Sequence, residues 1–384
     1  MVGSRWIRWL GPGVVALTAF AAVASTTLGA GDRPWAPATC GASSAQLLAA
    51  ARVPAPATVN DLGTEPWFRV DPALDRDGAL RAQRLIVGIG AGRARRASEL
   101  PGESFVAGPF GRLLLIGTDD GSRSRLVAYD VARDCAWVVA SEHDVIRRAT
   151  LDPAGATVYE TRVERASRAD LGVWRRALDA TEPAVAVLDA PPPDERFGRT
   201  FSTEFAWDAS ATRLAVQSCG ELACRTRFVV APPGTADPPL DPEAGPLVGL
   251  DGDEVVAFAA CRGRPCPIVS TNAVTGARRT VEPLADRATL VAAPDRVRVV
   301  VETVDHDARR MAALDLDDDN GVLIGSDDGL DLFAPLDAGS GMRVPAGWVL
   351  LGPDGRLPDD QTGIRPRLTR VSDGLTVVLD EVAS

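Results

Sequence analysis

Two short cysteine pairs in the middle of the chain have a spacing that could support chemistry. "CGELAC" runs from Cys219 to Cys224 and "CRGRPC" from Cys261 to Cys266, each with four residues between its cysteines. Such pairs can hold a metal, form a redox centre or close a disulfide. A thioredoxin-like redox centre uses a two-residue gap at the start of a helix, so the metal site and the disulfide remain to be compared.

The geometry of a short hairpin favours disulfides. A four-residue turn places the flanking cysteines opposite each other, with Cα atoms about 4.5–5.5 Å apart, inside the ~4.4–6.8 Å range of disulfides. A shared zinc site would need all four sulfurs within about 4 Å of one another, whereas packed sheets lie about 10 Å apart. We therefore predict the bridges Cys219–Cys224 and Cys261–Cys266. The two other cysteines, Cys40 and Cys135, then pair by elimination.

A histidine and an aspartate in "EHDVIRR" are the candidate catalytic residues. The chain has two histidines, His143 and His306, and a catalytic triad needs at least one. We expect His143 and Asp144 to lie on a connection between repeat units, where they could reach a ligand in a central channel. A plain surface loop explains the same residues, and His306 in "VDHDARR" is expected at a hairpin tip.

An acidic stretch, "DLDDDNG", begins like a calcium loop. Asp315, Asp317 and Asp319 have the alternating spacing of such loops. The match then fails, because Asn320 stands at position six and Ser326 at position twelve. A polar hairpin explains the same residues. We therefore predict that no cofactor is bound, and calcium is the one alternative that the sequence suggests.

The composition excludes several classes of function. The 384 residues carry a formal net charge of −11, and all 41 basic residues are arginine. Without lysine there is no Schiff-base or phosphate-loop lysine, and an acidic chain lacks the basic face that nucleic acids require. We interpret the local basic runs "GRARR" (Gly92 to Arg96) and "VWRRA" (Val173 to Ala177) as solvated loops.

The N-terminus has the pattern of an export signal. Arg5 and Arg8 precede the apolar run "LGPGVVALTAFAAV", and small residues follow it. We predict a signal peptide over residues 1–30. The alternative is an uncleaved membrane anchor, since the 18 residues from Gly11 to Leu28 are just long enough to span a bilayer. Either way the body of the protein is expected outside the cytoplasm, where disulfides persist.

An Ala/Pro-rich leader over residues 31–60 separates this segment from the rest of the chain. Only "SSAQLLAAAR" (Ser43 to Arg52) has helical spacing, so we expect a linker with one short helix. A Cys40–Cys135 bridge would pin this leader to the rim of the domain that follows, over residues 61–384.

The cysteine pairs also reveal a repeat, because both cysteines of the second pair lie 42 residues after those of the first. Apolar strands that follow turn-rich stretches recur at intervals of 41–57 residues, beginning at Trp67, Leu113, Thr157, Leu214, Val255, Arg298 and Trp348. Most units carry further strands, such as "RLVAYD" and "AWVVAS". This period is that of a four-stranded propeller blade. We predict an all-β propeller of six or seven blades, in which one terminal unit can supply two half-blades that close the ring.

Several strands resemble the repeats of TolB-type and WD-like propellers, which read "W-S-P-D-G-x-x-L-A-F". "AWDASATRLAV" (Ala206 to Val216) keeps the Trp, the Asp and the Leu-Ala, and "TLDPAGATVYE" (Thr150 to Glu160) keeps Asp-Pro-x-Gly. "VAAPDRVRVVV" (Val291 to Val301) is a degenerate copy. The resemblance implies an exported bacterial propeller and says little about function.

The missing catalytic residue types favour a non-catalytic binding scaffold. We expect an exported monomer that presents loops to a protein or cell-envelope ligand and binds no nucleic acid. One alternative is an enzyme at the channel mouth, such as a metal-dependent lactonase or lyase. The other is an accessory protein of an envelope complex, which would contact the membrane and face outward only if the N-terminal segment stays as an anchor.

Overall fold

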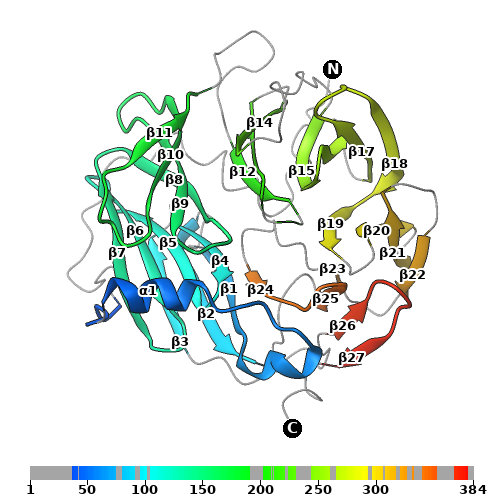
Figure 1. Cartoon of the computed structure of the whole chain (residues 1–384), viewed down its shortest axis with the longest axis horizontal. Coiled ribbons are helices and arrows are strands. Elements are labelled where there is room, and N and C mark those ends of the chain that lie inside the picture. The colour runs from blue at the N-terminus through cyan, green and yellow to red at the C-terminus, as the bar shows by residue number, and fades with distance from the viewer. Residues whose placement is uncertain are drawn as a thin grey trace, which may run out of the picture.

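The computed structural model shows a ring of seven β-sheets around a central axis (Figure 1). It describes residues 37–41, 43–74, 80–90, 96–101, 104–190, 202–208, 210, 212–220, 224–230, 244–259, 265–292, 296–305, 308–316, 321–326, 331–332, 340–352 and 367–378. Six sheets have four strands, and in the seventh the structure describes three. The predicted all-β propeller is therefore confirmed, with seven blades.

The first four blades follow the chain in order and are named blades 1 to 4. Blade 1 consists of β24 (Ser340–Met342), β1 (Pro66–Leu74), β2 (Leu80–Ile89) and β3 (Arg96–Pro101). Blade 2 consists of β4 (Phe105–Phe110), β5 (Leu113–Asp119), β6 (Ser124–Asp130) and β7 (Cys135–Glu142). Blade 3 consists of β8 (Val145–Leu151), β9 (Thr157–Val163), β10 (Asp170–Ala177) and β11 (Val185–Leu188). Blade 4 consists of β12 (Ser202–Trp207), β13 (Leu214–Cys219) and β14 (Cys224–Val230).

The remaining three blades complete the ring. Blade 5 consists of β15 (Ala244–Asp251), β16 (Glu254–Ala259), β17 (Cys266–Asn272) and β18 (Arg278–Ala285). Blade 6 consists of β19 (Arg287–Ala292), β20 (Val297–Asp305), β21 (Ala308–Asp315) and β22 (Gly321–Ser326). Blade 7 consists of β23 (Asp331–Leu332), β25 (Trp348–Gly352), β26 (Arg367–Arg370) and β27 (Thr376–Val378).

The apolar strands found from the sequence all occupy one position in the blades. Each of the seven lies on the second strand of its sheet, from β1 in blade 1 to β25 in blade 7. These strands are apolar on both faces because each sheet is covered by a blade on either side. In β5, Leu113 and Leu115 pack toward blade 3, whereas Leu114 and Ile116 pack toward blade 1. A single blade would expose both apolar faces to water, so it buries them only when neighbouring blades of the ring cover it.

The ring is closed by a strand whose sequence lies within the last blade but which pairs in the first. Strand β24 lies in the sequence between β23 and β25, which pair with each other in blade 7. It leaves that blade and pairs with β1 in antiparallel register, Trp67 opposite Met342. Blade 1 is therefore built from segments far apart in the chain, three strands from its first part and one from its last part.

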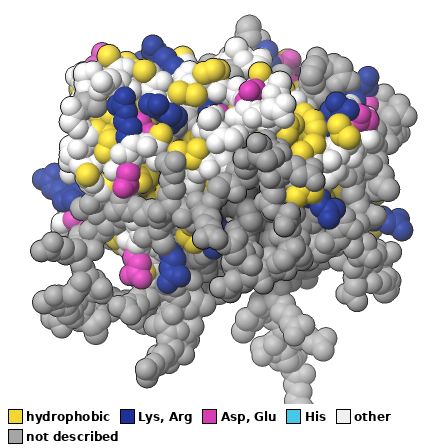
Figure 2. Space-filling model, turned by 90° about the horizontal axis from the view of Figure 1, so that it is seen from below, with side chains coloured by type: hydrophobic (Ala, Val, Ile, Leu, Met, Phe, Trp, Pro, Cys, Tyr) yellow, Lys and Arg dark blue, Asp and Glu magenta, His cyan; other side chains and the backbone are white. Residues whose placement is uncertain are grey.

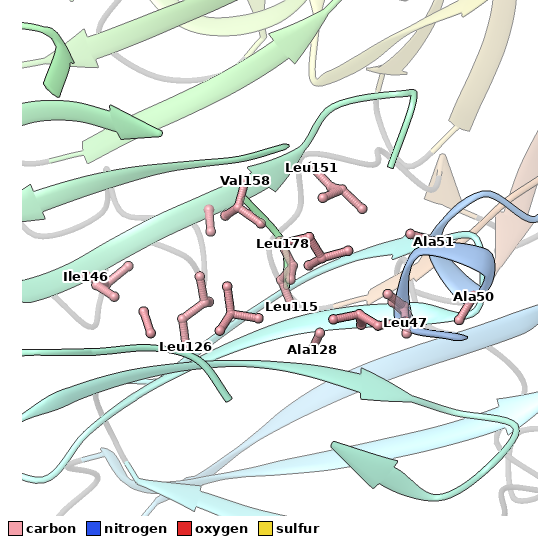
Figure 3. Packing of buried hydrophobic residues seen from close by; sticks show 14 of the residues in the cluster. Leu47, Ala50, Ala51, Leu115, Leu126, Ala128, Ile146, Leu151, Val158 and Leu178 are labelled. Atoms are coloured by element: carbon pink, nitrogen blue, oxygen red, sulfur yellow. The ribbon is translucent and has the colours of Figure 1, made fainter. Parts of the chain in front are cut away.

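The leader crosses one end of the ring, which we call the leader face. This end carries the β4–β5, β8–β9 and β12–β13 turns. Helix α1 (Ser44–Ala51) presents Leu47, Ala50 and Ala51 to the core between blades 2 and 3 (Figure 3). The 3₁₀-helix η2 (Val59–Thr64) adds Leu62 to the core between blades 7 and 1. The described part of the leader, which contains the one short helix that we expected, thus packs onto the ring.

Helix α1 can approach the ring closely because of Gly111. The backbone N–H of Arg112 donates to the Ala50 carbonyl at 2.9 Å. Gly111 has a φ of +57°, and a Cβ added to it would lie 2.2 Å from that carbonyl oxygen. An eight-residue helix is marginal in water by itself, so this docking onto the ring stabilises it.

Charged and apolar side chains share the outer surface of the ring. Side chains of both charges are scattered among apolar ones over the side of the ring in Figure 2. Neither helix in this part of the chain has the length and hydropathy of a bilayer-spanning segment. The predicted signal segment, residues 1–30, lies outside the described residues, so the choice between cleaved signal and anchor stays a prediction.

Candidate functional site

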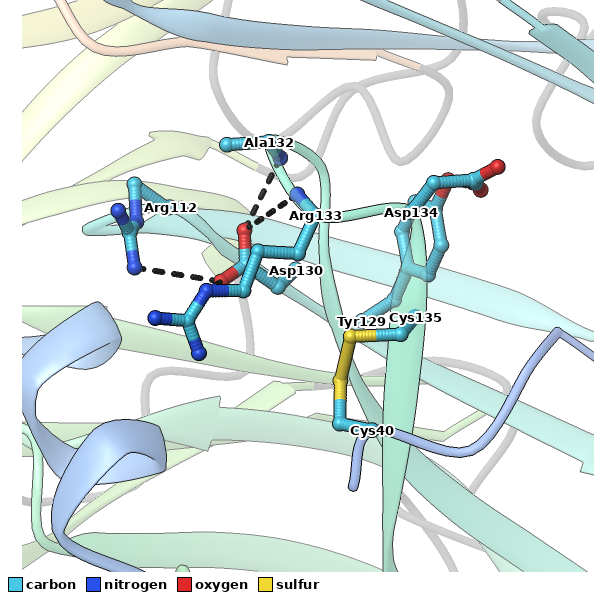
Figure 4. Close-up of a disulfide and its surroundings, with 8 residues drawn as sticks. All are labelled: Cys40, Arg112, Tyr129, Asp130, Ala132, Arg133, Asp134 and Cys135. Atoms are coloured by element: carbon cyan, nitrogen blue, oxygen red, sulfur yellow. Dashed lines mark hydrogen bonds and ion pairs between the residues drawn. A yellow bond between two sulfur atoms is a disulfide. The ribbon is translucent and has the colours of Figure 1, made fainter. Parts of the chain in front are cut away.

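The leader is fixed to blade 2 by a disulfide between Cys40 and Cys135, with Cα atoms 5.0 Å apart (Figure 4). Cys135 begins β7, the outermost strand of blade 2. Next to it Thr39 pairs with Ala136 in parallel, and the Ala136 N–H donates to the Ala38 carbonyl at 2.9 Å. The bridge that elimination suggested therefore pins the leader to the rim.

The cysteine pair of blade 4 closes the β13–β14 hairpin. Cys219 and Cys224 face each other in the register and form a disulfide with Cα atoms 4.0 Å apart, which is closer than we expected. In blade 5, Cys266 begins β17 and is also disulfide-bonded. Cys261 lies outside the described residues. Neither described pair forms a metal site or a redox centre of the thioredoxin type.

The two candidate catalytic residues lie on the connection between β7 and β8, at the end of the ring opposite the leader. His143 is exposed and Asp144 half-buried. The carbonyl of His143 accepts a hydrogen bond from Arg165 Nε at 2.8 Å, and Arg165 also forms an ion pair with Asp119 at 2.6 Å. These contacts hold the backbone of the connection and do not involve the imidazole ring of His143. Their catalytic role stays a prediction, and His306 lies outside the described residues.

The neighbouring β5–β6 turn contains a carboxylate with a shifted pKa. Asp120 accepts hydrogen bonds from the backbone N–H of Arg123, which has the largest effect, and from the hydroxyl and backbone N–H of Ser122. Together these bonds lower the pKa of Asp120 to about 2. Because the folded pKa lies below the unfolded one, the turn gains stability above the unfolded pKa and loses it as pH falls through about 2.

We expect an NMR titration of the Asp120 carboxyl carbon to show this low value. Ser122→Ala should move the pKa part of the way back toward the ordinary range, because one donor is lost. The control is Ser167→Ala in the β9–β10 turn, which should leave Asp120 unchanged. An ordinary pKa for Asp120 in the wild type would contradict the prediction.

The predicted calcium residues are described only in part. Asp315 ends β21 and is paired with two arginines, Arg296 at 2.6 Å and Arg298 at 2.8 Å. Asp317 and Asp319 lie outside the described residues. Among the described residues, no three His, Cys, Asp or Glu side chains gather as metal ligands would. Calcium binding stays an alternative to the prediction that no cofactor is bound.

The aspartates of the repeat motif hold the turns on the leader face. Asp152 Oδ1 accepts the backbone N–H groups of Ala156 and Thr157 at 2.6 and 2.7 Å. In the next blade, Asp208 Oδ1 accepts those of Thr212 and Arg213 at 2.8 and 2.9 Å. The motif thus marks the turn between the first two strands of a blade.

A cavity of about 610 Å³ lies between the leader and these turns, and we call it the leader pocket. It is bordered by residues 51–55 of the leader, 109–111 of blade 2, 151–154 of blade 3, Trp207 and Arg343. The size is that of pockets for small molecules. It brings together five segments that are far apart in the sequence, and sequence analysis did not find it.

The apolar wall of the leader pocket contains Phe110 and Trp207, both half-buried. The Trp207 ring packs edge-on against Tyr159, with ring centroids 5.9 Å apart, and its Nε1–H donates to Thr150 Oγ1 at 3.3 Å. These contacts fix the orientation of the indole ring, which the sequence had marked only as a repeat residue.

The polar wall contains an arginine that ties the leader to the ring-closing strand. Arg343 follows β24; its Nη1 donates to the Val53 carbonyl at 2.7 Å, and it forms an ion pair with Glu65 at 2.8 Å. Burial raises the pKa of Glu65, and the charge of Arg343 opposes this shift. Since Glu65 neutralises Arg343, this side of the pocket carries little net charge.

A buried cluster of charges lies between blades 2 and 3, away from the leader pocket. Glu160 Oε1 accepts hydrogen bonds from Arg162 Nε at 2.8 Å and from Arg176 Nη2 at 2.9 Å. Glu142 pairs with both arginines, and the guanidinium of Arg162 lies 4.4 Å from the centre of the Trp174 ring. We had interpreted "VWRRA" as a solvated loop, but it is part of β10, and Arg176 is buried because two glutamates neutralise it.

No protein-family model matches the chain, and no curated protein matches its sequence. Among solved structures, the chain is similar to TolB from Acinetobacter baumannii, with 10% identity and a TM-score of 0.40 over 67% of this chain and 62% of that one. A prolyl endopeptidase matches with 14% identity and a TM-score of 0.49 over 87% of this chain and 51% of that one.

An oligogalacturonate lyase in complex with manganese matches with 12% identity and a TM-score of 0.49 over 82% of this chain and 85% of that one. The chain spans less than two-thirds of the length of the TolB and prolyl endopeptidase chains. At these identities the similarity concerns the fold alone and assigns no activity. The seven-sheet ring places the chain among the β-propeller proteins.

Proposed function

We propose that the protein is an extracytoplasmic binding protein that takes its ligand into the leader pocket and releases it unchanged. The observation that carries this proposal is the pocket itself, in which aromatic rings, prolines and arginines form the wall. These side chains supply contact area and hydrogen-bond donors, which is the chemistry of binding. The Cys40–Cys135 and Cys219–Cys224 disulfides favour a location outside the cytoplasm.

The leader makes this face suitable for recognition. Residues 51–55 form one wall of the pocket; α1 in the core holds their beginning, and the Arg343 contact holds Val53 at their centre. A wall that is already ordered costs little entropy when a ligand binds. A protein or cell-envelope partner suits this face, because the pocket is open to solvent at its rim.

A ligand screen tests the proposal. The disulfide-bonded protein is screened by thermal shift against a library of peptides, glycans and small metabolites. Ala55 is an exposed residue of the pocket wall, so Ala55→Trp should fill the cavity without disturbing the core. Ala132→Trp, on the exposed β6–β7 turn outside the pocket, is the matched control.

We expect at least one ligand whose thermal shift is lost in Ala55→Trp and kept in Ala132→Trp. Mass spectrometry after overnight incubation should recover that ligand unchanged. A ligand that is chemically altered would overturn the non-catalytic assignment. A complete screen in which every shift survives Ala55→Trp would overturn the pocket as the binding site.

A further inference from the structure

One arginine at the rim of the leader pocket has unused hydrogen-bond donors. Arg52 Nε donates to the Ala154 carbonyl at 2.8 Å, which fixes the guanidinium beside blade 3. Its two terminal nitrogens contact no acceptor, and no carboxylate pairs with it, within the part of the chain that the structure describes. Arg343, across the pocket, differs because Glu65 and the Val53 carbonyl engage all its nitrogens.

One aspartate of the same pocket has an unused acceptor. Asp152 Oδ1 holds the turn amides, and Oδ2 accepts no hydrogen bond from any described residue. At the equivalent position in blade 4, both carboxylate oxygens of Asp208 accept hydrogen bonds. Its Oδ2 accepts the Ser210 hydroxyl at 2.6 Å and the Thr212 hydroxyl at 3.3 Å. Of these two repeat positions, the one that borders the pocket therefore leaves its second oxygen open.

The two open charges do not neutralise each other. Arg52 and Asp152 border one cavity, yet they form no ion pair. A ligand with a single charge would satisfy one of them and leave the other to water. A ligand with both charges would satisfy both, and its apolar part would contact Phe110 and Trp207.

We propose that the leader pocket binds a short peptide with free termini and apolar side chains. Its carboxylate is held by the terminal nitrogens of Arg52, and its ammonium group by Oδ2 of Asp152. Planar guanidinium groups suit carboxylates because they offer two parallel donors. A cavity of about 610 Å³ accommodates a dipeptide of aromatic residues. This inference rests on the proposed function, because it names the ligand class for the same pocket.

Three related dipeptides test the charges one at a time by calorimetry at low salt. Phe-Phe carries both charges, N-acetyl-Phe-Phe only the carboxylate, and Phe-Phe-amide only the ammonium group. We expect Phe-Phe to bind about tenfold more tightly than either derivative, because each of them loses one charge-assisted hydrogen bond.

Two conservative variants assign each charge to its residue. Arg52→Gln should weaken Phe-Phe and N-acetyl-Phe-Phe about tenfold and leave Phe-Phe-amide unchanged. Asp152→Asn keeps Oδ1 as the acceptor for the turn amides, and it should weaken Phe-Phe and Phe-Phe-amide while sparing N-acetyl-Phe-Phe. Arg123→Gln, on the exposed turn of the opposite face, is the control that should change none of the three affinities.

The outcomes separate this inference from the proposed function. If Ala55→Trp abolishes Phe-Phe binding but Arg52→Gln and Asp152→Asn do not weaken it, the charge assignment is overturned and the pocket stands. The same holds if no dipeptide binds while another ligand is lost in Ala55→Trp. Phe-Phe binding that survives Ala55→Trp overturns the peptide site.

Discussion

Replacing Glu160 by glutamine is expected to lower the free energy of unfolding by about 3–5 kcal/mol, because it leaves two buried arginines without their central counter-ion. The side chain of Glu160 is fully buried, and those of Arg162 and Arg176 are 5% and 7% exposed. Glu142, at 27% exposure, stays as a partner but lies nearer to solvent. The remaining charges would be +2 and −1 in the interface between blades 2 and 3.

Urea unfolding followed by tryptophan fluorescence measures this loss. The matched control is Asp373→Asn, which removes one partner of the exposed Arg370–Asp373 pair. That pair is open to water, so its loss should cost far less than the loss of Glu160. A Glu160→Gln cost as small as that of the control would contradict the prediction.

A further variant separates the buried charge from general damage to the interface. In Glu160→Leu/Arg162→Met/Arg176→Met, apolar side chains of similar length replace the three buried members of the cluster, while Glu142, which is 27% exposed, keeps access to water. Because no unpaired charge is then buried, we expect stability within about 1 kcal/mol of the wild type. A triple variant that is as unstable as Glu160→Gln would show that the interface depends on shape rather than on charge balance.

Removing the Cys40–Cys135 disulfide is expected to cost about 4–5 kcal/mol in the chain-entropy account, because the bridge joins residues 95 apart. The Cys40→Ser/Cys135→Ser variant is compared with the wild type by urea unfolding under non-reducing conditions. Cys219→Ser/Cys224→Ser is the matched control; its bridge joins residues only five apart, so its loss should cost about 2 kcal/mol. Equal losses in the two variants would contradict this account.

The same variant should also weaken the closure of the ring. The leader contacts blade 2 through α1, the end of β24 through Val53 and Arg343, and blade 7 through η2. It therefore spans the junction at which β24 completes blade 1. We expect faster hydrogen exchange in α1 and β24 of the variant, and unchanged exchange in β16 of blade 5. Unchanged exchange in β24 would show that the leader does not hold the junction.

Much of the fold could be predicted from the sequence because its signals are local. A sheet covered on both faces needs strands that are apolar at every position, and "LLLIG" in β5 and "VVAFA" in β16 show this pattern directly. The period of about 42 residues in the cysteines has the same origin, since each blade uses its turns at the same places. The hairpin bridge of Cys219 and Cys224 follows from spacing alone.

The ring closure and the docking of the leader had weaker signals. Strand β24 has three residues, Ser340–Met342, which is too short for any periodic pattern. In α1 the apolar residues Leu47, Ala50 and Ala51 have helical spacing, but nothing in the sequence says which surface they contact. The structure shows the docking surface at Gly111, whose missing side chain leaves room for the Ala50 carbonyl.

The sequence by itself determined the strand repeat, the hairpin disulfide and the Asp-bearing turns, because each depends on residues close together in the chain. Only the tertiary structure decided the candidate site, because Arg52, Phe110, Asp152 and Trp207 come from the leader and three different blades. The burial of Arg176 and Glu160 likewise depends on their ion pair, which joins side chains on two different strands. Interactions between distant segments depend on how the blades stack around the axis, and no local pattern records that arrangement.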